Sequence, residues 1–193
     1  MSTTSTAGRT GEMPAQRHAP TRYDATSRLL HWVTVALILA AAGLGLWIAY
    51  GRPEEEAFKL RLYTLHESIG VTIWLVTLVR LAWRLGHPPP PLPADMPNLL
   101  KAVARFNHAA FYLWLLTMPV VGFLATNAWG FPLTWFWLVP LPDPVGKDVP
   151  LAETLTLIHR IMAWSLVAMI VLHVSGALWH HFVRRDGTLR KML

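Results

Sequence analysis

Long runs of apolar residues dominate the chain, and four of them reach the length of a membrane span. The runs cover residues 29–50, 65–83, 106–128 and 157–182. Each is close to the roughly 20 residues that an α-helix needs to cross the hydrocarbon core of a bilayer. The pattern therefore predicts an all-α integral membrane protein, built as a four-helix bundle within the lipid bilayer.

The segments between the runs carry helix start and stop signals. Asp24, Thr26 or Ser27 can cap the first helix. The proline run from Pro88 to Pro93 cannot continue the second helix, so we expect a linker there. Residues 1–21 are rich in Ser, Thr, Gly, Pro and Arg, which predicts a disordered tail, not a signal peptide, ahead of one membrane domain over residues 22–193.

The connection between the third and fourth runs, residues 129–150, is neither a fifth span nor an ordinary solvated loop. It holds five prolines together with Trp129, Phe131, Trp135, Phe136 and Trp137. Amphipathic aromatic side chains favour the membrane–water boundary. The segment is predicted to lie on the outer surface of the bundle, either as a lid or as an interfacial anchor without chemistry.

Composition agrees with a membrane protein and limits the chemistry. The chain is 53% hydrophobic and only 15% charged. Its formal net charge is +6, but the basic residues lie between the apolar runs, which argues against nucleic-acid binding. Because there is no cysteine, disulfides, thiolate metal sites and covalent c-type haem are excluded. A metal must be held by histidine, methionine or carboxylate.

Lys and Arg flank the runs unevenly, and positive residues near span ends are retained on the cytoplasmic side. Twelve lie before the first run, around the second connection and after the fourth run, so both termini are predicted to be cytoplasmic. The twelve are Arg9, Arg17, Arg22, Arg28, Arg80, Arg84, Lys101, Arg105, Arg184, Arg185, Arg190 and Lys191. The other side has Arg52, Lys59, Arg61, Lys147 and Arg160.

Histidines inside the apolar runs are the candidate functional residues, because an ionisable side chain in a membrane needs a partner. His159 and His173 are 14 residues apart on the fourth run. At about 100° and 1.5 Å per residue they lie within about 40° of one helix face and about 21 Å apart along the axis. One helix can therefore ligate two centres, one near each membrane surface.

Depth selects the partners of these two histidines. The first run begins near His31 on the inner side, where His173 also lies, and the second begins near His66 on the outer side, as does His159. Two bis-histidine sites between apolar helices fit two b haems per chain, with these four residues as the axial iron ligands.

Three alternatives remain open. Zinc would need further ligands, and Glu67 and Glu153 could supply oxygens only at the outer site. A membrane histidine can also serve as a hydrogen-bond partner between helices. His108 begins the third run at the depth of the inner site, so it could replace His31 as ligand or donate a hydrogen bond to a quinone carbonyl.

Other residues carry weaker signals. Glycines in the runs let a flat cofactor approach the backbone, but small residues also serve ordinary helix packing. His18 and His87 lie in polar segments, and His180 and His181 lie where the fourth run leaves the membrane. The glycines are Gly43, Gly45, Gly70, Gly122 and Gly176.

The histidines and their neighbours resemble the prokaryotic cytochrome b561 family, small bacterial di-haem membrane proteins whose wider group includes the cytochrome b subunits of nickel-iron hydrogenases. The resemblance covers about residues 21–193. It rests on Tyr23-Asp24, Leu30-His31-Trp32, Leu65-His66-Glu67-Ser68-Ile69-Gly70, Asn107–Tyr112, Met118–Gly122, Leu157-Ile158-His159, Leu172-His173 and Trp179–Leu189.

The resemblance implies haem ligation by His31 with His173 and by His66 with His159, and residence in a bacterial inner membrane. It also implies an oxidoreductase that exchanges electrons with ubiquinone, and the family includes superoxide oxidases. Our leading hypothesis is electron transfer from a periplasmic small-molecule or protein donor, superoxide among them, to ubiquinone. The alternative is an electron-transfer subunit that docks on a separate dehydrogenase or hydrogenase. The outer basic residues either focus an anionic donor or face lipid headgroups.

Overall fold

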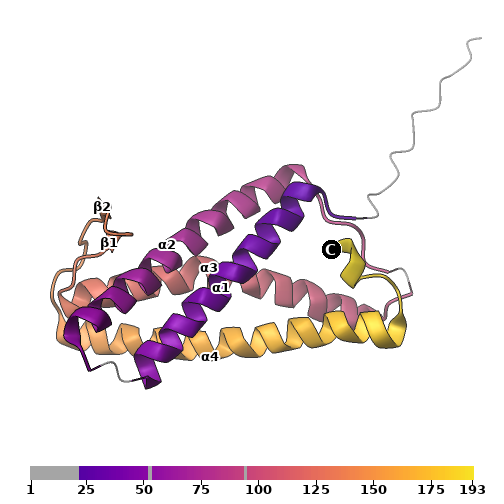
Figure 1. The fold of residues 1–193 in the computed structure, drawn as a ribbon. Coiled ribbons are helices and arrows are strands. Elements are labelled where there is room, and N and C mark those ends of the chain that lie inside the picture. Colours follow the sequence, from indigo (N-terminus) through magenta and orange to yellow (C-terminus); the bar gives the residue numbers. More distant parts are fainter. Residues whose placement is uncertain (1–21, 52–53, 94) are drawn as a thin grey trace, which may run out of the picture.

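Four long helices make up most of the protein. The structure is a computed structural model that describes residues 22–51, 54–93 and 95–193, so the predicted tail over residues 1–21 lies outside the described residues. Consecutive helices run in opposite directions (Figure 1). The helices are α1 (Ala25–Tyr50), α2 (Glu56–Gly86), α3 (Asn98–Trp129) and α4 (Val149–Trp179).

α1 and α4 begin ahead of their apolar windows, each directly after a polar capping residue. Asp24 is the N-cap of α1, where its carboxylate accepts hydrogen bonds from the backbone N–H and the hydroxyl of Ser27 at 2.9 and 2.6 Å. Asp148 caps α4 by accepting from the N–H of Leu151 at 3.1 Å. α3 ends at Gly130, whose φ of 86° is in the left-handed region.

The helices pack as two pairs that meet in the middle. α1 packs on α2, α3 packs on α4, and α2 joins the pairs through α3. In Figure 1 the α1–α2 pair crosses the α3–α4 pair at an angle, so the pairs separate along their length. Ile69, Ile73, Leu115 and Leu166 form the buried core where the pairs meet.

Most apolar side chains lie on the outside of the bundle, as they do in a membrane protein. Between 6% and 17% of the residues in the most apolar window of each helix are buried. Large side chains such as Leu39 and Val171 are about 60% exposed in mid-helix. All four helices are long and apolar enough to cross a bilayer, which agrees with the predicted membrane bundle.

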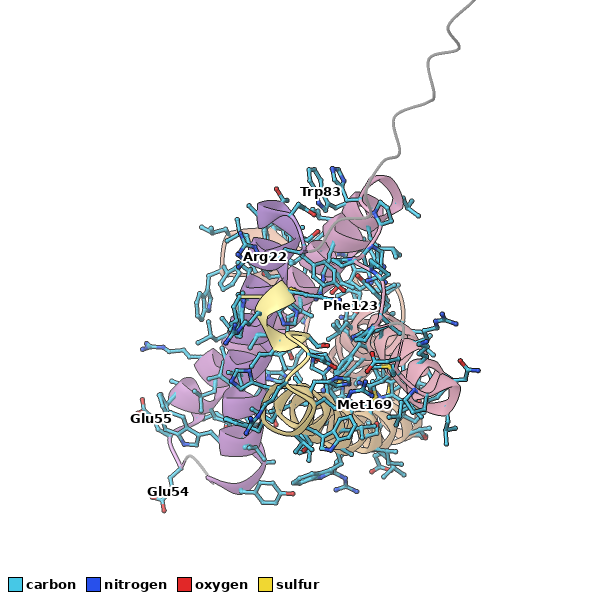
Figure 2. All side chains as sticks on the ribbon, turned by 90° about the vertical axis from the view of Figure 1, so that its right-hand side faces the viewer. Arg22, Glu54, Glu55, Trp83, Phe123 and Met169 are labelled. Carbon is cyan, nitrogen blue, oxygen red and sulfur yellow. The ribbon has the colours of Figure 1, made fainter. Side chains whose placement is uncertain are left out.

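The two chain ends meet at one end of the bundle, which we call the inner end, and the opposite end is the outer end. After α4 the chain forms a π-helical turn (His180–Arg184) and a 3₁₀ turn (Leu189–Lys191) and folds back over the start of α1. Arg22 donates to the carbonyl of Leu193 at 2.8 Å, and the Trp32 indole donates to the Met192 carbonyl at 3.0 Å. Figure 2 shows Arg22 beside the 3₁₀ turn.

The aromatic connection at the outer end forms a small hairpin, which the apolar pattern did not predict. Strands β1 (Thr134–Trp135) and β2 (Val139–Pro140) pair in antiparallel register. The turn between them contains Phe136 and Trp137 with φ of 48° and 59°. Bulky residues rarely adopt this left-handed backbone, so surrounding contacts must hold the turn in place.

Those contacts come from α2. The Trp135 indole N–H lies 3.2 Å from the Ser68 carbonyl and 3.3 Å from the Thr72 hydroxyl. The backbone N–H of Phe136 donates to the Ser68 hydroxyl at 2.8 Å, and the Phe136 ring packs against the buried core. Ser68 is fully buried and lies two residues after His66. The segment is therefore a hairpin fixed to α2 beside this histidine.

We predict that Ser68→Ala destabilises the protein by about 1 kcal/mol, because the Phe136 N–H loses its acceptor in a partly buried site. Thermal unfolding in detergent, followed by circular dichroism, measures the change. Thr117→Ala is the control, because the Thr117 hydroxyl bonds only to the Leu113 carbonyl of its own helix. An equal, small effect in both variants would mean that Ser68 does not hold the hairpin.

Candidate functional site

The structure brings the predicted histidines together in two groups, one at each end of the bundle. At the outer end, the ring centroids of His66 on α2 and His159 on α4 are 6.1 Å apart. At the inner end, those of His31 on α1 and His173 on α4 are 6.4 Å apart. Each group therefore includes one histidine from each helix pair.

Backbone carbonyls orient both outer rings. His66 Nδ1 lies 2.9 Å from the carbonyl oxygen of Ala41 on α1, and His159 Nδ1 lies 3.3 Å from that of Met118 on α3. A carbonyl only accepts hydrogen bonds, so Nδ1 carries the proton in each ring. The Nε2 lone pair of each neutral imidazole is then free, as a metal ligand requires.

A glycine gives each outer ring access to its carbonyl. Gly45 follows Ala41 by four residues, and Gly122 follows Met118 by four. A Cβ atom at Gly45 would lie 3.1 Å from His66 Cε1, and one at Gly122 would lie 3.0 Å from His159 Cε1. Both distances are tighter than ordinary van der Waals contact, so any larger residue would press on the ring.

The other glycines of the predicted set have no such role. A Cβ atom added at Gly43, Gly70 or Gly176 would meet no atom within 4 Å, apart from immediate neighbours and the local helix backbone. The structure thus divides the five glycines: two contact the outer histidines, and three leave open space. In sequence alone the two kinds look the same.

Three imidazoles gather at the inner end. The His108 ring on α3 lies 5.6 Å from the His173 ring, closer than His31 does. Phe111 packs edge-on against His173, with centroids 5.4 Å apart. A guanidinium nitrogen of Arg80 on α2 lies 3.1 Å from His31 Nδ1. This group therefore contains a cation that the outer group lacks.

Sequence reasoning treated Arg80 only as a flanking positive charge, although it lies inside the predicted second span over residues 65–83. An ionisable residue within a span is itself a sign of function. The same signal applies to Glu67, which was considered only as a zinc ligand. Glu67 follows His66 in α2, and its carboxyl oxygen accepts a hydrogen bond from the Thr126 hydroxyl of α3 at 2.6 Å.

The remaining histidines lie apart from both groups or outside the described residues. His87 stacks on Trp83 with ring centroids 3.9 Å apart and is exposed. His180 Nδ1 lies 2.5 Å from a carboxylate oxygen of Asp186. Burial alone would raise the pKa of Asp186, but hydrogen bonds from Thr188 and His180 outweigh it and lower the pKa to about 2. His18 is outside the described residues.

In the part of the chain that the structure describes, no group of three or more His, Asp or Glu side chains is arranged to hold a bare metal ion. Each end instead offers a facing pair of imidazoles on separate helices. Two metal–imidazole bonds of about 2 Å each would place the ring centres roughly 6 Å apart, which is close to the spacing at both ends. Such a pair suits a metal that brings its remaining ligands with it.

Comparison with known proteins agrees with this geometry. The family model for prokaryotic cytochrome b561 matches residues 22–193. The chain belongs to this family. It is 32% identical to cytochrome b561 homolog 2 of Escherichia coli K12 over 177 residues, which cover 91% of this chain and 93% of that protein. It is 27% identical to CybB of Yersinia pestis, named a probable superoxide oxidase, over 89% and 96% of the two chains.

Membership of the cytochrome b561 family makes the chain a membrane electron-transfer protein and implies haem b. The residues present fit that group. Haem brings four equatorial nitrogens and lacks two axial ligands, which a facing histidine pair can supply. The carbonyl bonds of His66 and His159 leave Nε2 free on both outer rings, and the two glycines keep the backbone close to them.

We predict that Gly45→Ala lowers haem content, because the new methyl group pushes His66 off the Ala41 carbonyl. Loss of such a supporting contact weakens metal binding roughly 10- to 100-fold. Haem per chain after purification is the measurement. Gly43→Ala on the same helix is the matched control, since its methyl group meets open space. If both variants kept full haem, Gly45 would be an ordinary packing residue.

Proposed function

We propose that the chain binds two b haems and passes electrons between a donor at the outer end and ubiquinone near the inner end. His66 and His159 would hold the outer haem, and His31 and His173 the inner one. The observation that carries the proposal is the pair of facing imidazoles at each end, with centroids 6.1 and 6.4 Å apart. A bis-histidine haem takes up and releases one electron at its iron.

His31 is preferred over His108 as the inner ligand because of the helix packing. α3 and α4 pack directly on each other, and the His108 and His173 rings are in edge contact between them. α1 and α4 belong to different pairs, which separate toward the inner end (Figure 1). A flat macrocycle would fit more easily between helices of different pairs than between α3 and α4, which pack directly on each other.

The chain's own residues keep the two sites dry and separate. Between them lie Ile69, Ile73, Leu115 and Leu166, with further apolar side chains packed around this cluster. His159 and His173 are 14 residues apart on α4, which places the sites roughly 21 Å apart along that helix. Electrons would therefore cross a single apolar layer within the membrane.

The charge distribution supports cytoplasmic termini and an inner-membrane location. Among the described residues, the inner end has ten basic and three acidic side chains, and the outer end has four basic and seven acidic. Positive residues are retained on the cytoplasmic side. The inner end, with both termini, would then face the cytoplasm, and the hairpin would face the periplasm.

His108 suits a quinone site at the inner end. Its ring contacts His173 but is not needed to complete the inner pair. An imidazole can donate a hydrogen bond to a quinone carbonyl and pass on a proton as the ring is reduced. We therefore assign His108 to ubiquinone and leave His31 as the ligand.

Superoxide is the proposed donor, supported by the name of the Yersinia pestis relative. Two superoxide ions and two protons would convert one ubiquinone to ubiquinol and release two molecules of oxygen. Of the two sequence-based alternatives for the outer basic residues, focusing of this anion has less support, because acidic side chains outnumber basic ones among the described residues of the outer end. Arg61 and Arg160 are exposed, as expected for residues that face headgroups.

The acidic outer end favours a second candidate, in which the donor is a protein. Glu54 and Glu55 project from the α1–α2 connection, away from Arg22 at the inner end (Figure 2). An acidic surface steers a basic partner and repels a small anion. The chain would then be an electron-transfer subunit of a separate dehydrogenase or hydrogenase.

We predict that His159→Ala and His173→Ala each remove one of two haems, because each breaks a different site. Haem per chain and the bis-histidine absorption spectrum are the measurements. His87→Ala is the control, since this exposed ring stacks on Trp83 and belongs to neither histidine pair. Two haems remaining in either ligand variant would contradict the assignment.

We further predict that the purified chain oxidises superoxide and reduces ubiquinone in the ratio of two superoxide ions to one quinone.

His108→Phe should keep both haems and their spectra but slow reoxidation of the reduced haems by ubiquinone at least tenfold. Stopped-flow absorbance follows both steps. An inactive chain with two haems would favour the docking subunit, and loss of a haem in His108→Phe would make His108 a ligand.

A further inference from the structure

Two arginines at the inner end of α2 face the same aromatic ring. Arg80 and Arg84 are one helical turn apart, and both guanidinium groups lie over Tyr112 of α3, at 5.8 and 5.7 Å from its centroid. Both side chains are partly buried. Arg80 also reaches His31, with its nitrogen 3.1 Å from Nδ1. The two positive charges therefore lie against the inner histidine group.

Neither arginine forms a salt bridge within the described part of the chain. The acidic side chains of the inner end are engaged elsewhere: Asp24 accepts from Ser27 and Trp83, and Asp95 and Asp186 both pair with Arg184. A positive charge in a membrane span is costly without an anionic partner. No acidic side chain in the described part of the chain is placed to pair with Arg80 or Arg84, so the two cations are open to an anionic group of a bound cofactor.

The contact between Arg80 and His31 also indicates that Arg80 has another partner when a metal is bound. A guanidinium group only donates, so His31 Nδ1 accepts in this contact, and a neutral ring then carries its proton on Nε2. A histidine that binds metal through one nitrogen carries its proton on the other and cannot accept from Arg80. When His31 ligates a metal, the Arg80 guanidinium needs a different acceptor.

We propose that Arg80 and Arg84 form an anion site for the propionate carboxylates of the inner haem. This inference rests on the proposed function, since it requires a haem at His31 and His173. Guanidinium groups bind carboxylates through paired, charge-assisted hydrogen bonds. Two cations beside the inner haem also stabilise its reduced form. The site would therefore favour an electron on the inner haem.

Arg80→Gln and Arg84→Gln in the purified holoprotein test this site. In each variant, the redox equilibrium of one haem should shift at least tenfold toward the oxidised form. This shift corresponds to a reduction potential lowered by 59 mV for a one-electron couple. Each should also shift the propionate band of that haem in redox-difference infrared spectra. Arg80→Lys should restore most of the redox shift, because it keeps the charge. Arg61→Gln, which removes an exposed outer charge, should change neither reading.

The outcomes distinguish failure of the arginine site from failure of the proposed function. Loss of one haem in Arg80→Gln but not in Arg80→Lys would support the site, since charge is then required for binding. The proposal would be overturned if both Gln variants kept two haems and an unshifted propionate band. It would also be overturned if the variants differed from the unaltered chain in redox equilibrium only after anionic phospholipid was added to the neutral detergent, because the arginines would then bind lipid. The proposed function itself fails separately, if the unaltered chain does not bind two haems.

Discussion

The outer end of this bundle depends on one contact, an imidazole Nδ1 bonded to a backbone carbonyl of the neighbouring helix. That carbonyl also accepts the helical hydrogen bond from the backbone N–H four residues later in the chain. A second donor, such as an imidazole, must therefore approach past the side chain of that later residue. Glycine at Gly45 and Gly122 removes the side chain and allows the approach. The bond fixes the tautomer, which leaves Nε2 of His66 and His159 for a metal. One small residue per helix therefore determines both packing and ligand chemistry.

The inner end is built differently. His31 has a guanidinium neighbour in place of a carbonyl, and His173 is surrounded by His108, Phe111 and His31. Its rings are therefore oriented by side chains, which can move, whereas the outer rings are oriented by backbone. A rigid site suits a centre that only receives and passes electrons. A site lined by side chains with exchangeable partners is compatible with the proposed contact to a quinone.

The sequence predicted the bundle and the grouping of the histidines because both follow from simple geometry. Helix rise and alternating direction place His31 with His173 and His66 with His159 before any contact is known. The carbonyl bonds could not be predicted, since Gly45 and Gly43 differ only in which neighbouring helix atoms they meet. The hairpin was also missed: two-residue strands carry no periodic signal, and its turn uses backbone angles that Phe136 and Trp137 rarely adopt.

Charge distinguishes the two ends of the bundle more clearly than the spacing of the histidine pairs does. Each end has a histidine from each helix pair, and the inner end has His108 in addition, but only the inner group has a guanidinium, that of Arg80, in contact with one of its rings. In a medium of low dielectric, such charges act strongly on a nearby redox centre. A guanidinium favours the reduced form of a centre beside it. With haems at both histidine pairs, as proposed, Arg80 would therefore favour an electron at the inner end over one at the outer end.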